Sequence, residues 1–167
     1  MHRIVTLGML AVLIVILIIS CGQKKTQAQL YAEAFRYERE ENFEKAVETF
    51  ESLIDTYPQS EVVDSVLFRI GQIYSNNIGD FKKSVLTHER LIQHCPESSL
   101  AAQSLFMIGY HFANNIGELD SARVYYKKFI DTYPNHELVN SVKWELDHLG
   151  QDINEIDFFK NDSADKS

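Results

Sequence analysis

The chain has 167 residues, of which 45% are hydrophobic and 11% aromatic, so it is long enough to bury one core. Seven glycines and three prolines are few for a turn-rich all-β fold, and their scarcity favours helices. A net charge of −8 argues against nucleic acid as a partner, because phosphate binding needs a basic surface.

An apolar segment occupies the first positions of the chain. Residues 4–19 are almost entirely aliphatic and follow Arg3, a pattern typical of a secretory signal. The segment is shorter than the ~20 residues that span a bilayer comfortably. It ends in Ile18-Ile19-Ser20-Cys21, which resembles the lipobox of bacterial lipoproteins. That resemblance implies cleavage before the cysteine and attachment of fatty acid, such as palmitate, to its thiol.

This resemblance divides the N-terminal region into a signal peptide, 1–20, and a lipidated tether, 21–27. Gly22 rather than an aspartate follows the cysteine, which implies the periplasmic side of the outer membrane if the organism has two membranes. An uncleaved membrane helix with an incidental cysteine is the alternative. Lys24 and Lys25 argue against it, because positive charge on the translocated flank opposes the usual orientation.

Residues 28–150 contain a repeat. Tyr57-Pro58, Cys95-Pro96 and Tyr133-Pro134 are separated by 38 residues each. The same step relates further columns of residues, which are Asn42/Asp80/Glu118, Phe43/Phe81/Leu119, Ala46/Ser84/Ala122, Phe50/His88/Tyr126 and Leu53/Leu91/Phe129. So many columns in one register indicate a true internal repeat.

Each repeat is predicted to contain two helices. Apolar residues of the second helix recur at helical spacing, as in Phe43, Ala46, Val47, Phe50, Leu53 and Ile54. Asn42 and Asp80 can cap these helices, and Glu118 is a weaker substitute. Gly79 and Gly117 stand in the preceding connections, where a positive φ costs glycine little.

The repeat resembles the tetratricopeptide family. Two copies meet the family pattern of large, small and aromatic positions, with the residues Leu30, Ala34, Tyr37, Ala46, Phe50, Pro58 and Leu105, Gly109, Phe112, Ala122, Tyr126, Pro134. The middle copy departs at Ser84 and His88. The resemblance implies an all-α, short right-handed solenoid of three helical hairpins. The long period of 38 residues and the Tyr-Pro endings resemble those of outer-membrane assembly lipoproteins and periplasmic Tol-Pal-associated proteins.

A capping helix is predicted over 137–149, where Leu138, Val142, Leu146 and Leu149 form one narrow apolar stripe. Residues 151–167 form a polar tail that we expect to be mostly disordered. Its apolar residues either dock on the last repeat or stay free, and these are Ile153, Ile156, Phe158 and Phe159.

We find no catalytic pattern. His88 and His94 are six residues apart and fall on different helix faces, whereas a zinc protease helix needs a spacing of four. His88 occupies the column of Phe50 and Tyr126, so a packing role is favoured. Cys95 is interpreted as a small core residue. We therefore expect no enzyme activity, no metal and no cofactor; an enzyme or metal protein using the histidines is the less favoured reading.

Two columns of the leading helices are candidates for a partner groove. By tetratricopeptide geometry they line the concave face, and their members are Tyr31, Phe68, Phe106, Trp144 and Phe35, Gln72, Tyr110, His148. An aromatic groove suits an extended apolar peptide or a partner helix. The alternative is that these rings pack between neighbouring helices.

The leading hypothesis is a membrane-anchored interaction scaffold of the cell envelope, held by lipid at Cys21. Its partner would be an envelope protein or peptide from outer-membrane assembly or cell-wall machinery. The alternative is a structural accessory subunit that binds through faces other than the groove.

Overall fold

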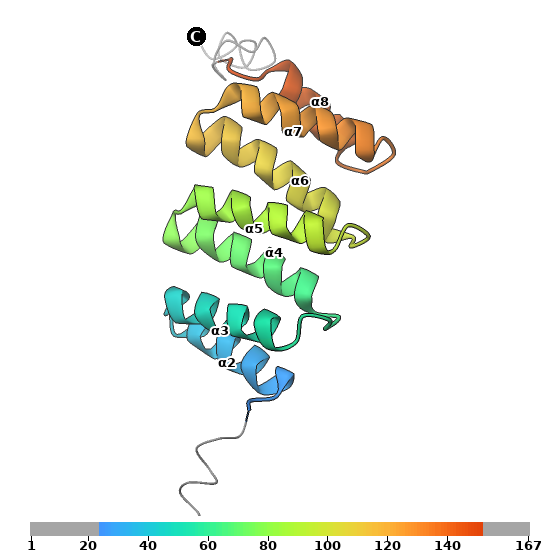
Figure 1. Ribbon diagram of the computed structural model, residues 1–167. Coiled ribbons are helices and arrows are strands. Elements are labelled where there is room, and N and C mark those ends of the chain that lie inside the picture. Colours follow the sequence, from blue (N-terminus) through green and yellow to red (C-terminus); the bar gives the residue numbers. More distant parts are fainter. Residues whose placement is uncertain (1–23, 152–167) are drawn as a thin grey trace, which may run out of the picture.

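The computed structural model describes residues 24–151, and every regular element in that range is helical (Figure 1). The elements are α2 Gln27–Arg39, α3 Phe43–Thr56, α4 Val63–Ile73, η1 Tyr74–Ile78, α5 Phe81–His94, α6 Leu100–His111, η2 Phe112–Ile116, α7 Leu119–Thr132 and α8 Val139–Asp147. The predicted all-α fold is confirmed for this part of the chain. Cys21, the signal segment and the tail beyond Gln151 lie outside the described residues.

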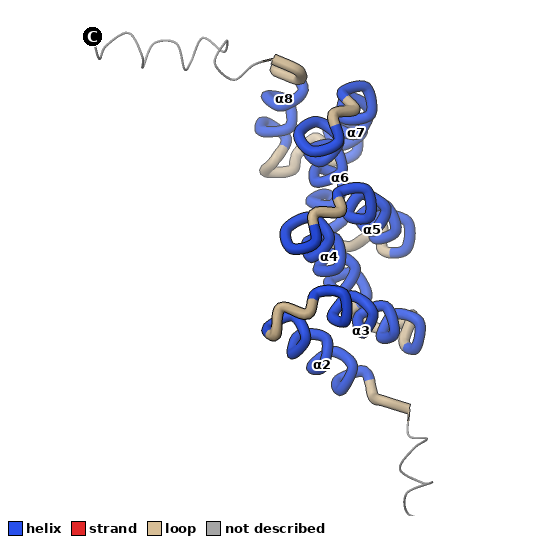
Figure 2. Tube along the Cα trace, turned by 90° about the vertical axis from the view of Figure 1, so that its left-hand side faces the viewer, coloured by secondary structure: helices blue, strands red, loops and turns tan. Residues whose placement is uncertain are grey.

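The helices stack in chain order, from α2 at the bottom of Figure 1 to α8 at the top. Helix α2 packs on α3, α4 on α5 and α6 on α7, each pair joined by a short connection. In the perpendicular view, α2 and α4 lie on one side while α3, α5 and α7 lie on the other (Figure 2). This is a tetratricopeptide-like solenoid, with α8 packed on α7 at its end.

The core is made by the columns of the repeat. Phe50, Leu53, Leu91, Tyr126 and Phe129 of the second helices are all fully buried. Full burial of one such side chain stabilises by about 1.5–3 kcal/mol, so these columns hold each hairpin together. The apolar interior forms two clusters, one from α2 to the start of α6 and the other from α6 to α8.

Polar side chains are buried where these clusters meet. His88 on α5 is fully buried, and its Nδ1 lies 3.1 Å from the Ser104 hydroxyl of α6. The Ser84 hydroxyl donates to the Gly71 carbonyl at 2.9 Å, also inside the protein. His111 on α6 is 3% exposed, and its ring centroid lies 6.5 Å from that of His88. The two departures from the family pattern, Ser84 and His88, therefore belong to one polar region.

The second helices begin at the predicted caps. The side chains of Asn42 and Asp80 accept hydrogen bonds from the backbone N–H of Lys45 and Lys83, respectively. Glu118 makes no such side-chain cap, as expected for the weaker residue. The cap hydrogen bond holds the pKa of Asp80 below its ordinary value, because it stabilises the carboxylate.

The second and third repeats have one more residue than the first between their two helices, since Leu67–Phe81 and Leu105–Leu119 are one residue longer than Leu30–Phe43, and this residue lies inside a helix. Helices α4 and α6 each continue into one π-helical turn, η1 and η2, which then ends at a glycine. Gly79 and Gly117 have φ of 78° and 81°, so the predicted positive φ is confirmed. A π-helical turn accommodates one additional residue without interrupting the helix. The connection between α2 and α3 lacks this π-helical turn, and its residue of positive φ is Glu41, at 56°.

Two glycines of the first helices permit the closest helix approaches. A Cβ added at Gly109 would lie 2.6 Å from the Tyr126 ring, and one at Gly71 would lie 2.7 Å from His88 Nε2. These rings therefore pack directly against the backbone of the first helix, and any side chain at the glycine would displace them.

Helix α8 closes the stack. It is two residues shorter at each end than the predicted 137–149. Val142 is fully buried, and Leu138, Leu146 and Leu149 pack against the second cluster. The predicted apolar stripe therefore faces α7, while Trp144 on another side of the helix is 44% exposed.

Candidate partner-binding groove

The first column of the candidate groove has exposed ends and a half-buried middle. Tyr31 on α2 is 36% exposed and Trp144 on α8 is 44% exposed. Phe68 and Phe106 are half-buried, because each packs on the ring beneath it in the second helix. Their ring centroids lie 5.3 Å from His88 and 6.3 Å from Tyr126, respectively. These middle rings therefore combine helix packing with a partly open face.

The second column differs from one repeat to the next. Phe35 is half-buried and lies 4.8 Å from the Tyr31 ring, so the two form one aromatic pair on α2. The Gln72 side chain accepts a hydrogen bond from Arg69 at 3.2 Å. Tyr110 is 38% exposed. The middle of this column is thus polar, while its first and third members offer aromatic surface.

The structure brings three of the eight candidate residues together at the C-terminal end. Tyr110, Trp144 and His148 line a cavity of about 610 Å³ between α6, α7 and α8. The Trp144 and His148 rings stack with centroids 4.4 Å apart, which fixes the indole against the helix. The other five candidate residues line the first helices outside this cavity.

Sequence reasoning missed part of this cavity wall. Glu145 lines it, and burial raises the pKa of that carboxyl above its ordinary value. Leu119 also lines it and is 39% exposed, although its column predicts a buried residue. Leu119 is the first residue of α7, where the neighbouring helix covers it less than it covers residues one turn later. A charged residue on a capping helix carries no periodic signal, so Glu145 could not be found that way.

Three buried side chains beneath or beside the candidate groove residues have polar atoms without hydrogen-bond partners among the described residues. Tyr126 is fully buried and its hydroxyl has no hydrogen-bond partner within the described residues. Burial raises the pKa of Tyr126 far above its ordinary value, so this hydroxyl stays neutral. His88 Nε2 and His111 Nε2 are likewise buried without a partner there. Burial, and then the nearness of His111, lowers the pKa of His88 to about 4, so its ring is neutral at pH 7.

Cys95, interpreted as a small core residue, packs against the first apolar cluster without being fully buried. It is half-buried and lines a surface pocket at the end of α5. Burial raises the pKa of its thiol, which keeps the thiol protonated at neutral pH.

Between residues 24 and 151, no helix is both long enough and apolar enough to cross a membrane. The same residues contain no group of three or more histidine, cysteine or acidic side chains placed to hold a metal ion.

Comparison with known proteins gives one family. The family described as YfiO, outer membrane lipoprotein, matches residues 23–120. No curated protein matches the chain. The matched range extends from just before α2 to the first residues of α7, so Trp144 and His148 of α8 lie beyond it. Since this range covers more than half of the sequence, the chain belongs to the YfiO family of outer membrane lipoproteins.

Proposed function

We propose that this protein is a lipid-anchored scaffold of the bacterial cell envelope that presents its aromatic groove to a protein partner. The observation that carries the proposal is the exposed aromatic surface at the C-terminal end of the stack. Tyr110 and Trp144 are 38% and 44% exposed and line the same cavity. Aromatic side chains in a concave site are the groups that dominate protein–protein binding energy.

The anchor is proposed to be a lipid on Cys21. Membership of an outer membrane lipoprotein family supports it, and the family match begins two residues after this cysteine. Helix α2 begins at Gln27. Six residues of extended chain reach at most about 20 Å, so the first hairpin would lie close to the membrane. Helices α6–α8, which line the cavity, are at the opposite end of the stack from α2 (Figure 1), so the cavity would lie away from the membrane.

Substitution of the exposed groove residues tests this proposal. We choose Tyr110→Ala with Trp144→Ala, because Phe106 packs on buried Tyr126 and its loss would disturb the core. The full-length protein is affinity-purified from detergent-solubilised membranes of its own organism, and its co-purified proteins are compared. The double variant should lose the partner while its far-ultraviolet circular dichroism stays unchanged. Capture that survives with unchanged helicity would contradict the groove proposal.

A second candidate function uses another face of the stack. Leu86 on α5 and Val124 on α7 are each 63% exposed and are separated by one repeat step of 38 residues. Two exposed apolar residues in one column offer a contact on the second helices. This observation favours a structural accessory subunit that binds through a non-groove face.

A matched pair of variants separates the two functions. Leu86→Ala with Val124→Ala removes a similar amount of exposed apolar surface from the second helices. Under the groove proposal this control retains the partner, and photo-crosslinks form from a probe at Tyr110 but not at Val124. The reverse pattern would support the accessory function.

A further inference from the structure

The three positions that end the second helices have the same backbone. Tyr57, Cys95 and Tyr133 have φ/ψ of −131°/59°, −131°/57° and −126°/57°. In each, the backbone N–H donates to the carbonyl four residues earlier at 2.8 Å. Because the backbones agree, the Cα–Cβ bonds leave the chain in equivalent directions, and the three side chains enter equivalent spaces.

The two tyrosines fill that space with their rings. Tyr57 packs against the first apolar cluster, and its hydroxyl donates to the Lys25 carbonyl, just before α2, at 2.8 Å. Tyr133 packs against the second cluster, with its ring centroid 5.6 Å from that of Phe129. A phenol ring is therefore the group that this part of the repeat accommodates.

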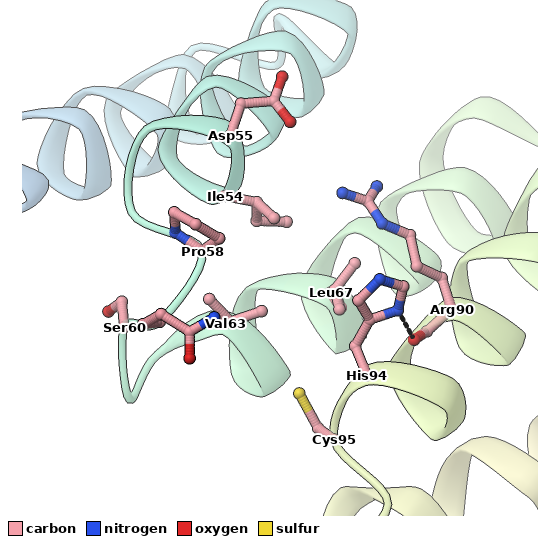
Figure 3. A pocket seen from close by; sticks show the side chains of 10 residues that line it. Ile54, Asp55, Pro58, Ser60, Val63, Leu67, Arg90, His94 and Cys95 are labelled. Carbon is pink, nitrogen blue, oxygen red and sulfur yellow. Dashed lines mark hydrogen bonds between the residues drawn. The ribbon is translucent and has the colours of Figure 1, made fainter.

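Cys95 leaves the corresponding space open. The structure has a pocket of about 500 Å³ there, lined by the residues Ile54, Asp55, Pro58, Gln59, Ser60, Val63, Leu67, Arg90, His94 and Cys95. Figure 3 shows the Cys95 sulfur pointing from the end of α5 into the space bordered by Val63, Leu67 and His94. Val63 and Leu67 belong to the start of α4, the first helix of the same hairpin. The Cys95 side chain therefore opens into this pocket, whereas Tyr57 and Tyr133 pack a ring against their apolar clusters.

We propose that this Cys95 pocket binds a tyrosine side chain of a partner protein. Ile54 and Val63, each 6% exposed, supply apolar surface for the ring. Ser60 lies in the turn that precedes α4, as Lys25, whose carbonyl accepts the hydrogen bond of the Tyr57 hydroxyl, lies in the segment that precedes α2. Polar rim groups at this turn can therefore receive the phenol hydroxyl, which distinguishes a tyrosine from a purely apolar residue.

A positively charged side chain, that of Arg90, also borders the Cys95 pocket. The Arg90 guanidinium is held by two hydrogen bonds to Glu51, at 2.9 and 2.7 Å, so it borders the pocket in a defined position. His94 is held in turn, with Nδ1 2.9 Å from the Arg90 carbonyl. None of the pocket residues belongs to the groove set. The Cys95 pocket is thus a separate site, and its test does not depend on the groove.

Binding of N-acetyltyrosinamide to the full-length protein in detergent micelles tests the proposal. Ligand-observed saturation-transfer NMR measures the affinity for the wild type, Cys95→Ala and Cys95→Tyr, with N-acetylalaninamide as the control ligand. Wild type and Cys95→Ala should bind the tyrosine amide, because both leave the pocket open. Cys95→Tyr should bind it at least about tenfold more weakly, since its own ring fills the space.

The stability of Cys95→Tyr is a second readout. The introduced ring should fill the pocket as Tyr57 and Tyr133 fill theirs, so the urea midpoint should rise above that of Cys95→Ala. A lower midpoint or a loss of helicity would overturn the proposal, because the pocket would then lack the shape of a tyrosine site. Equal binding by the wild type and Cys95→Tyr, or equal binding of the tyrosine and alanine amides, would overturn it as well.

Discussion

Gly109→Ala adds one methyl group at the closest approach between α6 and α7. The new Cβ would lie 2.6 Å from both Cδ1 and Cε1 of Tyr126. Carbon atoms in favourable contact are ~3.5–4.0 Å apart, so the ring must move by about 1 Å or the helices must separate. Tyr126 is fully buried and packed within the second cluster, which leaves the ring no free space to enter.

Two opposing effects set the magnitude. Alanine is favoured over glycine in a helix interior by about 1 kcal/mol. Overpacking a close-packed core typically costs about 1–3 kcal/mol, and a clash with two atoms of a buried ring belongs to the upper part of that range. We therefore expect Gly109→Ala to lower the free energy of unfolding by about 1–2 kcal/mol, even though it improves helix propensity.

Urea unfolding followed by far-ultraviolet circular dichroism measures this change. Tyr126→Leu provides the matched background, because it removes the ring that alanine meets. In that background Gly109→Ala should become neutral or stabilising, which gives a coupling energy between the two sites. Ala32→Gly, at an exposed position of α2, measures the difference in helix propensity between alanine and glycine alone. A Gly109→Ala protein as stable as the wild type would refute the reasoning about the helix contact.

Two further predictions concern the buried histidine and the proposed anchor. The pKa of His88 is lowered to about 4 by burial, so between about pH 6.5 and pH 4 the unfolded chain binds more protons than the native state, and stability should fall by about 3 kcal/mol across that window. Urea midpoints at neutral and acidic pH measure this loss of stability, and His88→Phe should make the loss smaller. An unchanged pH dependence in that variant would contradict the assignment of the loss to His88. Cys21→Ser should leave an unlipidated precursor that retains residues 1–20, seen by mass spectrometry and by the loss of fatty-acid labelling, and normal maturation of the variant would contradict the lipoprotein proposal.

Periodicity was enough to find the helices and their register. The spacing of Phe50, His88 and Tyr126 indicates which face of each second helix is buried, because a helix buries its apolar face. The caps Asn42 and Asp80 and the positive φ of Gly79 and Gly117 could be predicted as well, because each depends on one residue and its nearest backbone.

What the sequence left undetermined depends on neighbours distant in the chain. The π turns η1 and η2 absorb a residue that looks like part of a loop, since a repeat step does not tell where the extra residue is accommodated. The predicted groove columns recur at the repeat step, yet Phe68 and Phe106 pack partly on the rings of His88 and Tyr126. The sequence did indicate the Cys95 pocket, because Cys95 stands where the other repeats have a tyrosine. That difference could be interpreted as an open pocket only once the structure showed that the three positions share one backbone conformation.

The polar region between the two apolar clusters has a mechanical consequence. An elongated stack held at one end by a lipid and at the other by a partner bears any tension in series, through one helix pair after another. The interface of α5 and α6 contains three buried polar residues, His88, Ser104 and His111. If tension separated the stack at this interface, the protein would divide into an anchored segment of α2–α5 and a partner-bound segment of α6–α8, and most of each segment's apolar cluster would stay within it.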